Sequence, residues 1–215
     1  MTRASIVRNA AAIGVAVGAY GLGFGAVSVT AGLSVLQTCA LSLLAFTGAS
    51  QFALVGVLGA GGSVPAGMAG ALLLGSRNTL YAVRLAELLR LRGPRKHLAA
   101  QGTIDETTAM AISAPPALAG VAFWATFVAV YVCWNLATLL GALGAGVVDT
   151  SALGLDAAVG AAFLALLAPQ IHDRTGAQVA IGGALIAAVA IPFTPAGLPV
   201  LLAALAVVPA VVGRR

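Results

Sequence analysis

The chain has 215 residues, of which 60% are hydrophobic and only 8% are charged, and its formal net charge is +5. Because an ordinary soluble domain is about 25% charged, water is not the main solvent of this protein. The cations stand at the ends of apolar stretches rather than in a basic stripe interleaved with aromatic side chains. This pattern argues against a nucleic-acid-binding protein and indicates an integral membrane protein in a lipid bilayer.

Seven apolar stretches approach the length of about 20 residues that a helix needs to cross hydrocarbon. They are continuously apolar, whereas the strands of a membrane β-barrel alternate polar and apolar residues. We therefore predict an all-α, polytopic helix bundle that forms one transmembrane domain over residues 1–215. The stretches are residues 10–30, 35–60, 64–90, 117–147, 152–171, 177–193 and 197–212.

The first stretch carries four glycines, Gly14, Gly18, Gly21 and Gly25, at spacings of four, three and four. On a helix these positions form one seam, and a glycine seam allows another helix to pack closely. We expect a tight helix contact along this face.

The second stretch contains two hydrogen-bonding side chains, Ser50 and Gln51, just after Gly48. Lipid cannot satisfy them, so they must face other helices, water or a solute, and Gly48 favours a break in the helix there. We predict Gly48, Ser50 and Gln51 as substrate-binding residues. The alternative is that Gln51 only joins two helices.

The third stretch begins near Pro65 and places Arg77 about 18 Å along the helix axis, close to the middle of a core about 30 Å thick. A central arginine costs about 2.5–3.5 kcal/mol on insertion scales, so it needs a partner. Arg77, with the neighbouring Asn78 and Tyr81, is predicted to bind substrate. The alternative is that Arg77 ties helix ends together.

Residues 103–106, with the sequence Thr-Ile-Asp-Glu, have the spacing of a capping box in which Thr103 and Glu106 satisfy each other's backbone amides. This element predicts a helix that runs to about Ser113. Asp105, Glu106 and Asp156 are the carboxylates available for proton coupling. The alternative for Asp105 and Asp156 is a stabilising interaction with the helix dipole. His97 and His172 lack neighbours with metal-ligand spacing, so we predict neither a metal site nor a cofactor.

The cations also predict the topology. Residues 90–96, residues 172–174 and the carboxyl terminus are cationic, and by the positive-inside rule all three are cytoplasmic. Three crossings before Arg90 would put Arg3 and Arg8 outside. Either the amino terminus is external, which the larger charge of the later loops favours, or one early stretch is re-entrant.

With these residues in view, the chain resembles the AzlC family, the large subunit of bacterial branched-chain amino-acid exporters. Asn78 stands where many members of that family have histidine. The resemblance covers most of the chain and rests on four blocks in the family's order: Gly48-Ala49-Ser50-Gln51-Phe52, Arg77 with Leu80-Tyr81, residues 103–106, and Leu153-Gly154-Leu155-Asp156.

This resemblance implies export of leucine, isoleucine, valine and sometimes methionine from a bacterial cell, together with a small AzlD-type membrane subunit. Since no nucleotide-binding motif is present, we expect proton-driven antiport. A transporter or channel subunit for another small neutral solute is the alternative. An intramembrane serine hydrolase that uses Ser50 and His172 is disfavoured, because the two residues are predicted at different membrane depths.

Overall fold

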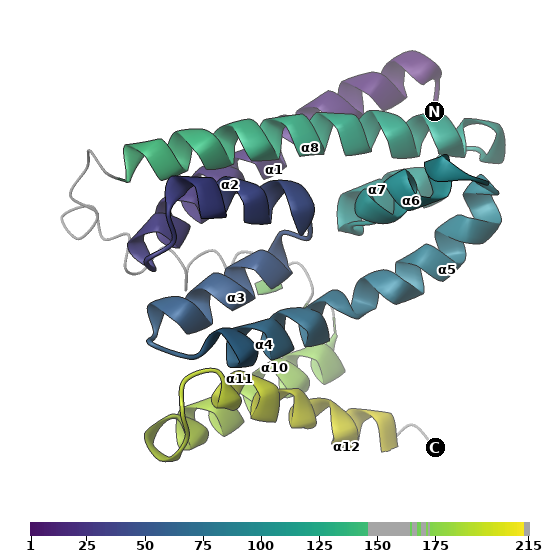
Figure 1. Cartoon of the computed structure of the whole chain (residues 1–215). Coiled ribbons are helices and arrows are strands. Elements are labelled where there is room, and N and C mark those ends of the chain that lie inside the picture. Colours follow the sequence, from purple (N-terminus) through teal and green to yellow (C-terminus); the bar gives the residue numbers. More distant parts are fainter. Residues whose placement is uncertain (146–163, 165–166, 169–170, 172, 213–215) are drawn as a thin grey trace.

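The computed structural model describes residues 1–145, 164, 167–168, 171 and 173–212, and every secondary-structure element in these residues is a helix (Figure 1). The predicted all-α membrane bundle is confirmed. Within the described ranges, three helical segments are long and apolar enough to cross a membrane: α1 (Arg3–Thr30), α8 (Ala119–Gly144) with the short turn η1 (Pro116–Leu118) before it, and α10 (Arg174–Ala190) with η4 (Ile191–Phe193) after it. The predicted stretch 152–171, with Asp156, lies mostly outside the described residues.

Helices α1 and α8 pack side by side along much of their lengths (Figure 1), and the glycine seam of α1 faces α8. A β-carbon added to Gly14 would lie 2.9 Å from the backbone of Ala129, and one added to Gly21 would lie 2.7 Å from the carbonyl oxygen of Trp134. One added to Gly25 would overlap the backbone at Thr138. The predicted close contact is confirmed, and only glycine allows the two backbones to approach this closely.

The second apolar stretch forms two short antiparallel helices, α2 (Val35–Leu44) and α3 (Ala49–Gly59), joined by a turn that ends at Gly48. At 1.5 Å per residue each helix is only about 15 Å long, half of the hydrocarbon thickness. Figure 1 shows that α3 returns towards the end from which α2 starts. The expected break near Gly48 is confirmed, but the expectation of one crossing over residues 35–60 is wrong, since the segment is a re-entrant hairpin.

The third stretch crosses the bundle as two helices, α4 (Val64–Gly75) and α5 (Arg77–Leu89), which are interrupted at Ser76. A second hairpin follows, made of α6 (Pro94–Gln101) and α7 (Asp105–Ser113). It enters from the opposite end of the bundle to the first hairpin (Figure 1). The tips of the two hairpins touch, because the Gln101 side-chain amide donates to the carbonyl oxygens of Leu43 and Leu44 at 2.9 and 3.1 Å.

The predicted start of a helix near residue 105 is confirmed, but the predicted capping box is wrong. Thr103 donates its hydroxyl to the carbonyl oxygen of Ala99 and does not cap α7. Instead, the residue before the helix is Ile104, whose backbone amide donates to the Thr107 hydroxyl at 3.1 Å. Only this half of a box forms, because the isoleucine side chain cannot accept a hydrogen bond and the Thr103 hydroxyl is held by the last turn of α6.

After α10, the chain turns and returns through α11 (Leu198–Ala203), η5 (Ala204–Ala206) and α12 (Val207–Val212). The turn lies beside the loop between α3 and α4, where Gly62 approaches Ala196 and Gly197 approaches Ala66. This end of the bundle is uncharged in the described loops at residues 31–34, 60–63 and 194–197.

The amino terminus and the cationic loop at residues 90–96 lie together at the other end of the bundle (Figure 1). The sequence leaves two alternatives, an external amino terminus or a re-entrant early stretch. This arrangement favours the second, although the charge count favoured the first. The first hairpin does not cross, so Arg3 and Arg8 join the later cations. By the positive-inside rule this end is expected in the cytoplasm.

Labelling of single cysteines tests this topology. In a chain whose Cys39 and Cys133 are replaced by serine, we expect a membrane-impermeant maleimide to label an exposed Ala60→Cys position in whole cells. Arg95→Cys, at the cationic end, should label only after the membrane is permeabilised. Labelling of Arg95→Cys in intact cells would reverse the orientation.

The glycine seam gives a matched pair of variants. Gly25→Ala should lower the free energy of unfolding by about 1–3 kcal/mol, because its methyl group overlaps the α8 backbone. Gly23→Ala lies on the same helix, but no atom lies within 4 Å of the new methyl group, so it should be neutral or stabilising. The measurement is thermal unfolding of the purified protein in detergent. Equal transition temperatures for the two variants would contradict the seam.

Candidate functional site

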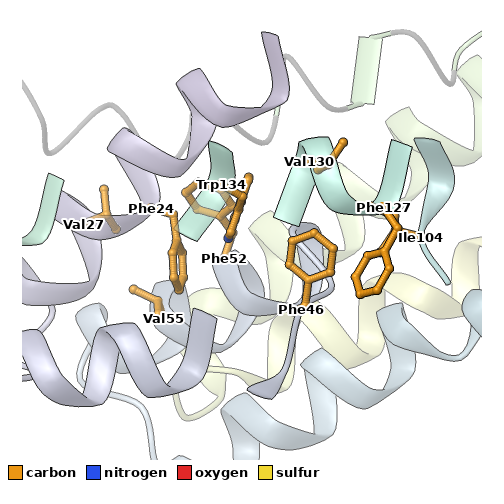
Figure 2. Packing of buried hydrophobic residues seen from close by; sticks show 9 residues of the cluster. All are labelled: Phe24, Val27, Phe46, Phe52, Val55, Ile104, Phe127, Val130 and Trp134. Atoms are coloured by element: carbon orange, nitrogen blue, oxygen red, sulfur yellow. The ribbon is translucent and has the colours of Figure 1, made fainter. Parts of the chain in front are cut away.

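A cavity lies where the two hairpin tips meet the start of α5 and the middle of α1 and α8. One side of it is apolar and aromatic, with contributions from Phe46, Phe52, Val130 and Trp134, and most of these side chains are buried in the cluster that Figure 2 shows. The other side is polar and is formed by Arg77, Asn78, Asp105 and Glu106. An apolar wall faced by a few polar groups is the usual lining of a small-molecule site.

The first hairpin tip owes its shape to Gly48 and Gln51. Gly48 has a φ angle of +59°, which only glycine adopts readily, and it lets the chain reverse before α3. The Gln51 side chain then accepts from the Gly48 amide at 3.1 Å and donates to the carbonyl oxygen of Leu41 at 2.9 Å. Both ends of this buried side chain thus hold the tip together.

A second set of hydrogen bonds fixes the first hairpin on α8. The Ser42 hydroxyl donates to the Asn135 side-chain oxygen at 2.7 Å, and the Tyr131 hydroxyl donates to the carbonyl oxygen of Leu43 at 3.2 Å. These two bonds hold the hairpin against the part of α8 that carries Trp134, which is next to Asn135 in the sequence and lines the cavity.

Three interrupted helices begin at this cavity. Ala49, Arg77 and Asp105 are the first residues of α3, α5 and α7, and all three line the cavity. The amino-terminal end of a helix carries a partial positive charge and unpaired amide groups, which favour an anion. Such discontinuous helices at mid-membrane depth are typical of the substrate sites of transporters.

Arg77 and Asp105 form an ion pair across the polar side, with 2.7 Å between Nη2 of the arginine and Oδ2 of the aspartate. The Tyr81 hydroxyl donates to the other carboxylate oxygen, Oδ1, also at 2.7 Å. The pair therefore connects α5 to α7. About a third of each charged side chain remains exposed (31% for Arg77 and 37% for Asp105), so both can be reached by a solute.

Five buried side-chain polar atoms in the described part of the chain have no hydrogen-bond partner, and three of them belong to residues that line the cavity. These three are Nε of Arg77, Oδ1 of Asn78 and Nε1 of Trp134. An unpaired buried polar atom costs about 1–3 kcal/mol, and in a native protein it calls for an explanation. A ligand with matching acceptors and donors would satisfy them.

The structure brings together five of the sequence-predicted site residues around the cavity: Gly48, Arg77, Asn78, Asp105 and Glu106. Tyr81 lies behind Asp105 and reaches the site through its hydrogen bond. Two other predicted residues lie elsewhere. Ser50 is buried beside Gly75, and Gln51 is used by the hairpin tip, as its alternative interpretation had it.

Sequence reasoning missed the aromatic wall. Trp134 does carry a signal in the sequence, because an indole N–H in the middle of an apolar stretch needs a polar partner. Phe46 carries no such signal, because only the reversal of the chain brings it to the cavity. Among the described residues, no group of three or more His, Cys, Asp and Glu side chains is placed to hold a metal ion.

Comparison with known proteins identifies the family. The chain is 30% identical over 168 residues to an uncharacterized membrane protein of Archaeoglobus fulgidus. The aligned region covers 75% of this chain and 73% of that protein. No solved structure matches the chain. A family model described as AzlC protein matches residues 12–148, a range that includes both hairpins and the whole cavity. The chain is therefore a membrane protein of the AzlC family, a family related to membrane transport.

Proposed function

We propose that this chain is the large subunit of an exporter that moves branched-chain amino acids out of the cell, in exchange for protons. The observation that carries the proposal is the cavity between the hairpin tips, which combines an apolar wall with unpaired polar atoms beside an arginine. The binding residues in this proposal are Gly48, Arg77, Asn78 and Trp134.

The ligand chemistry follows from the two sides of the cavity. A carboxylate suits the Arg77 guanidinium, the Trp134 indole N–H and the amino-terminal ends of the three helices. An ammonium group suits the Asn78 side-chain oxygen and the carboxylate of Asp105. A branched apolar side chain suits the wall of Phe46, Phe52, Val130 and Ile104.

The family supports the remaining parts of the proposal. The AzlC resemblance implies leucine, isoleucine, valine and sometimes methionine as substrates, and a small AzlD-type membrane subunit as the partner. We place the complex in the bacterial plasma membrane, with the carboxyl terminus in the cytoplasm. Asp105, with Glu106 and Asp156 as further candidates, is proposed to carry the proton.

Efflux of labelled amino acids tests this function. Cells that express the chain with its small partner subunit should lose preloaded leucine faster than cells with an empty vector, and an uncoupler should stop uphill efflux. The rate at which the cells lose alanine or glycine should not change, because the side chains of these amino acids are too small to contact the apolar wall of the cavity. Equal leucine loss with and without the chain would contradict the proposed function.

Trp134→Phe keeps most of the ring but removes the unpaired N–H, so the affinity for leucine should fall about tenfold, the value of one hydrogen bond to a charged group. Trp124→Phe is the matched control, since Trp124 lies on the same helix but does not line the cavity. Binding of labelled leucine to the purified complex gives both affinities. Equal affinities for the two variants would remove Trp134 from the site.

Arg77→Lys keeps the positive charge but loses the planar guanidinium group, which can contact two acceptors at once. Leucine export should fall at least about tenfold, while the amount of protein in the membrane stays the same. The control is Arg84→Lys, on the same helix, where the arginine pairs with Glu87 at 3.2 Å and does not line the cavity. If Arg77→Lys exports leucine at the parent rate, the arginine does not hold the carboxylate.

A further inference from the structure

The ion pair between Arg77 and Asp105 is the feature of this site that the proposed function does not yet explain. It occupies the charged groups that a substrate would need, and it connects the start of α5 to the tip of the second hairpin. A zwitterionic amino acid has the same two charges on one carbon atom. Its carboxylate can replace Asp105 on Arg77, and its ammonium group can replace Arg77 on Asp105.

We propose that the Arg77–Asp105 pair is a lock that opens for either of two ligands, a zwitterionic amino acid inserted between its members or a proton on Asp105. This inference rests on the proposed function and gives it a coupling mechanism. In the empty site the pair ties α5 to α7. A zwitterion opens the pair and leaves every charge partnered, and a proton opens it by neutralising the carboxylate.

The two ligands exclude one another at Asp105. When the carboxylate is protonated, it no longer attracts an ammonium group, so binding of the amino acid releases that proton to solution. The reaction is Asp105–COOH plus the zwitterion giving Asp105–COO⁻ paired with the ammonium group, plus H⁺. The amino acid and the proton compete for Asp105, and each of them opens the same pair between α5 and α7. One ligand is therefore carried in each direction across the membrane, which is antiport.

The neighbours of Asp105 fit this role. Tyr81 on α5 donates to Oδ1 at 2.7 Å and keeps the carboxylate in place when Arg77 leaves. Glu106 on α7 and Tyr20 on α1 are the other titratable groups of the cavity wall, whereas α8 contributes the uncharged Val130 and Trp134. Nε of Arg77 is buried and has no hydrogen-bond partner in the closed pair, so one donor of the guanidinium stays unsatisfied while the pair is intact.

The test is the pH dependence of leucine binding to the purified complex of the full chain with its small partner. In the parent protein, affinity should fall about tenfold per pH unit below a midpoint, because one proton competes with the ammonium group. Calorimetry in two buffers of different ionisation enthalpy should show proton release on binding in that range. Affinity that rises as the pH falls would overturn the proposal, because proton and amino acid would then bind together.

Three variants assign the proton to Asp105. Asp105→Asn should bind leucine more weakly than the parent at high pH, with no proton release and no pH dependence, and should still exchange leucine but not move it uphill. Glu87→Gln, which lies on the same helix as Arg77 but outside the cavity, should keep the parent midpoint. Tyr81→Phe removes a donor from the charged carboxylate, so its midpoint should rise by about one pH unit. Asp105→Asn with the parent pH dependence, or Tyr81→Phe with an unchanged midpoint, would overturn the assignment.

Two analogues test the insertion itself. The probe 4-methyl-2-oxopentanoate lacks the ammonium group of leucine, and 3-methylbutylamine lacks its carboxylate. Each should bind at least about tenfold more weakly than leucine, since it leaves one member of the opened pair without a partner. Leucine transport by a parent protein that releases no proton on binding at any pH would refute the lock, while the proposed export of branched-chain amino acids would stand. Failure to bind or transport leucine at all would refute the function.

Discussion

Hydrocarbon offers no hydrogen bonds, so a helix can be interrupted inside a membrane only where other protein groups satisfy the freed backbone. The chain has such interruptions at residues 45–48, at Ser76 and at residues 102–104. At the first, the carbonyl oxygens of Leu41, Leu43 and Leu44 accept from Gln51, Gln101 and Tyr131. At the third, the Thr107 hydroxyl serves both the Ile104 amide and the Gly102 carbonyl.

These hydrogen bonds place the three breaks next to one another, and the cavity is the space that they enclose. Because the breaks are in contact, the amino-terminal ends of α3, α5 and α7 converge instead of being scattered through the bundle. The close packing of α1 on α8 forms the opposite wall, where the ring centroids of Phe24 and Trp134 are 5.9 Å apart. A charged pair can exist here because it faces a polar cavity and not lipid.

Some features of this arrangement are predictable from the sequence, because a residue type or a short spacing indicates each of them directly. The spacing of Gly14, Gly18, Gly21 and Gly25 predicts the seam, Gly48 predicts a break, and the depth of Arg77 predicts a partner. The reversal at Gly48 is not predictable in the same way. The apolar stretch 35–60 has the length of one crossing, and the direction of the chain after the break depends on bonds from the distant residues Gln101 and Tyr131.

The same limit applies to the site. Arg77 and Asp105 are separated by a helix, a charged loop and a second helix, so their pairing follows from the second hairpin and not from spacing along the sequence. The helix start differs from the predicted one by one residue, with Ile104 before the helix in place of Thr103. The difference depends on whether the last turn of α6 retains the Thr103 hydroxyl, and helix boundaries of this kind are not fixed by propensity alone.

The position of the break at Ser76 has an electrical consequence. Twelve residues of α4 precede it and thirteen residues of α5 follow it, so a charge at Arg77 or Asp105 lies near the electrical midpoint of the bilayer. Moving one elementary charge through the whole membrane potential is worth about 2.3 kcal/mol per 100 mV, and through half of it about half as much. A zwitterion carries no net charge, so voltage acts on the proton alone. In the proposed exchange, a proton that reaches Asp105 from outside would gain half of that energy on entry and the other half when it leaves for the cytoplasm.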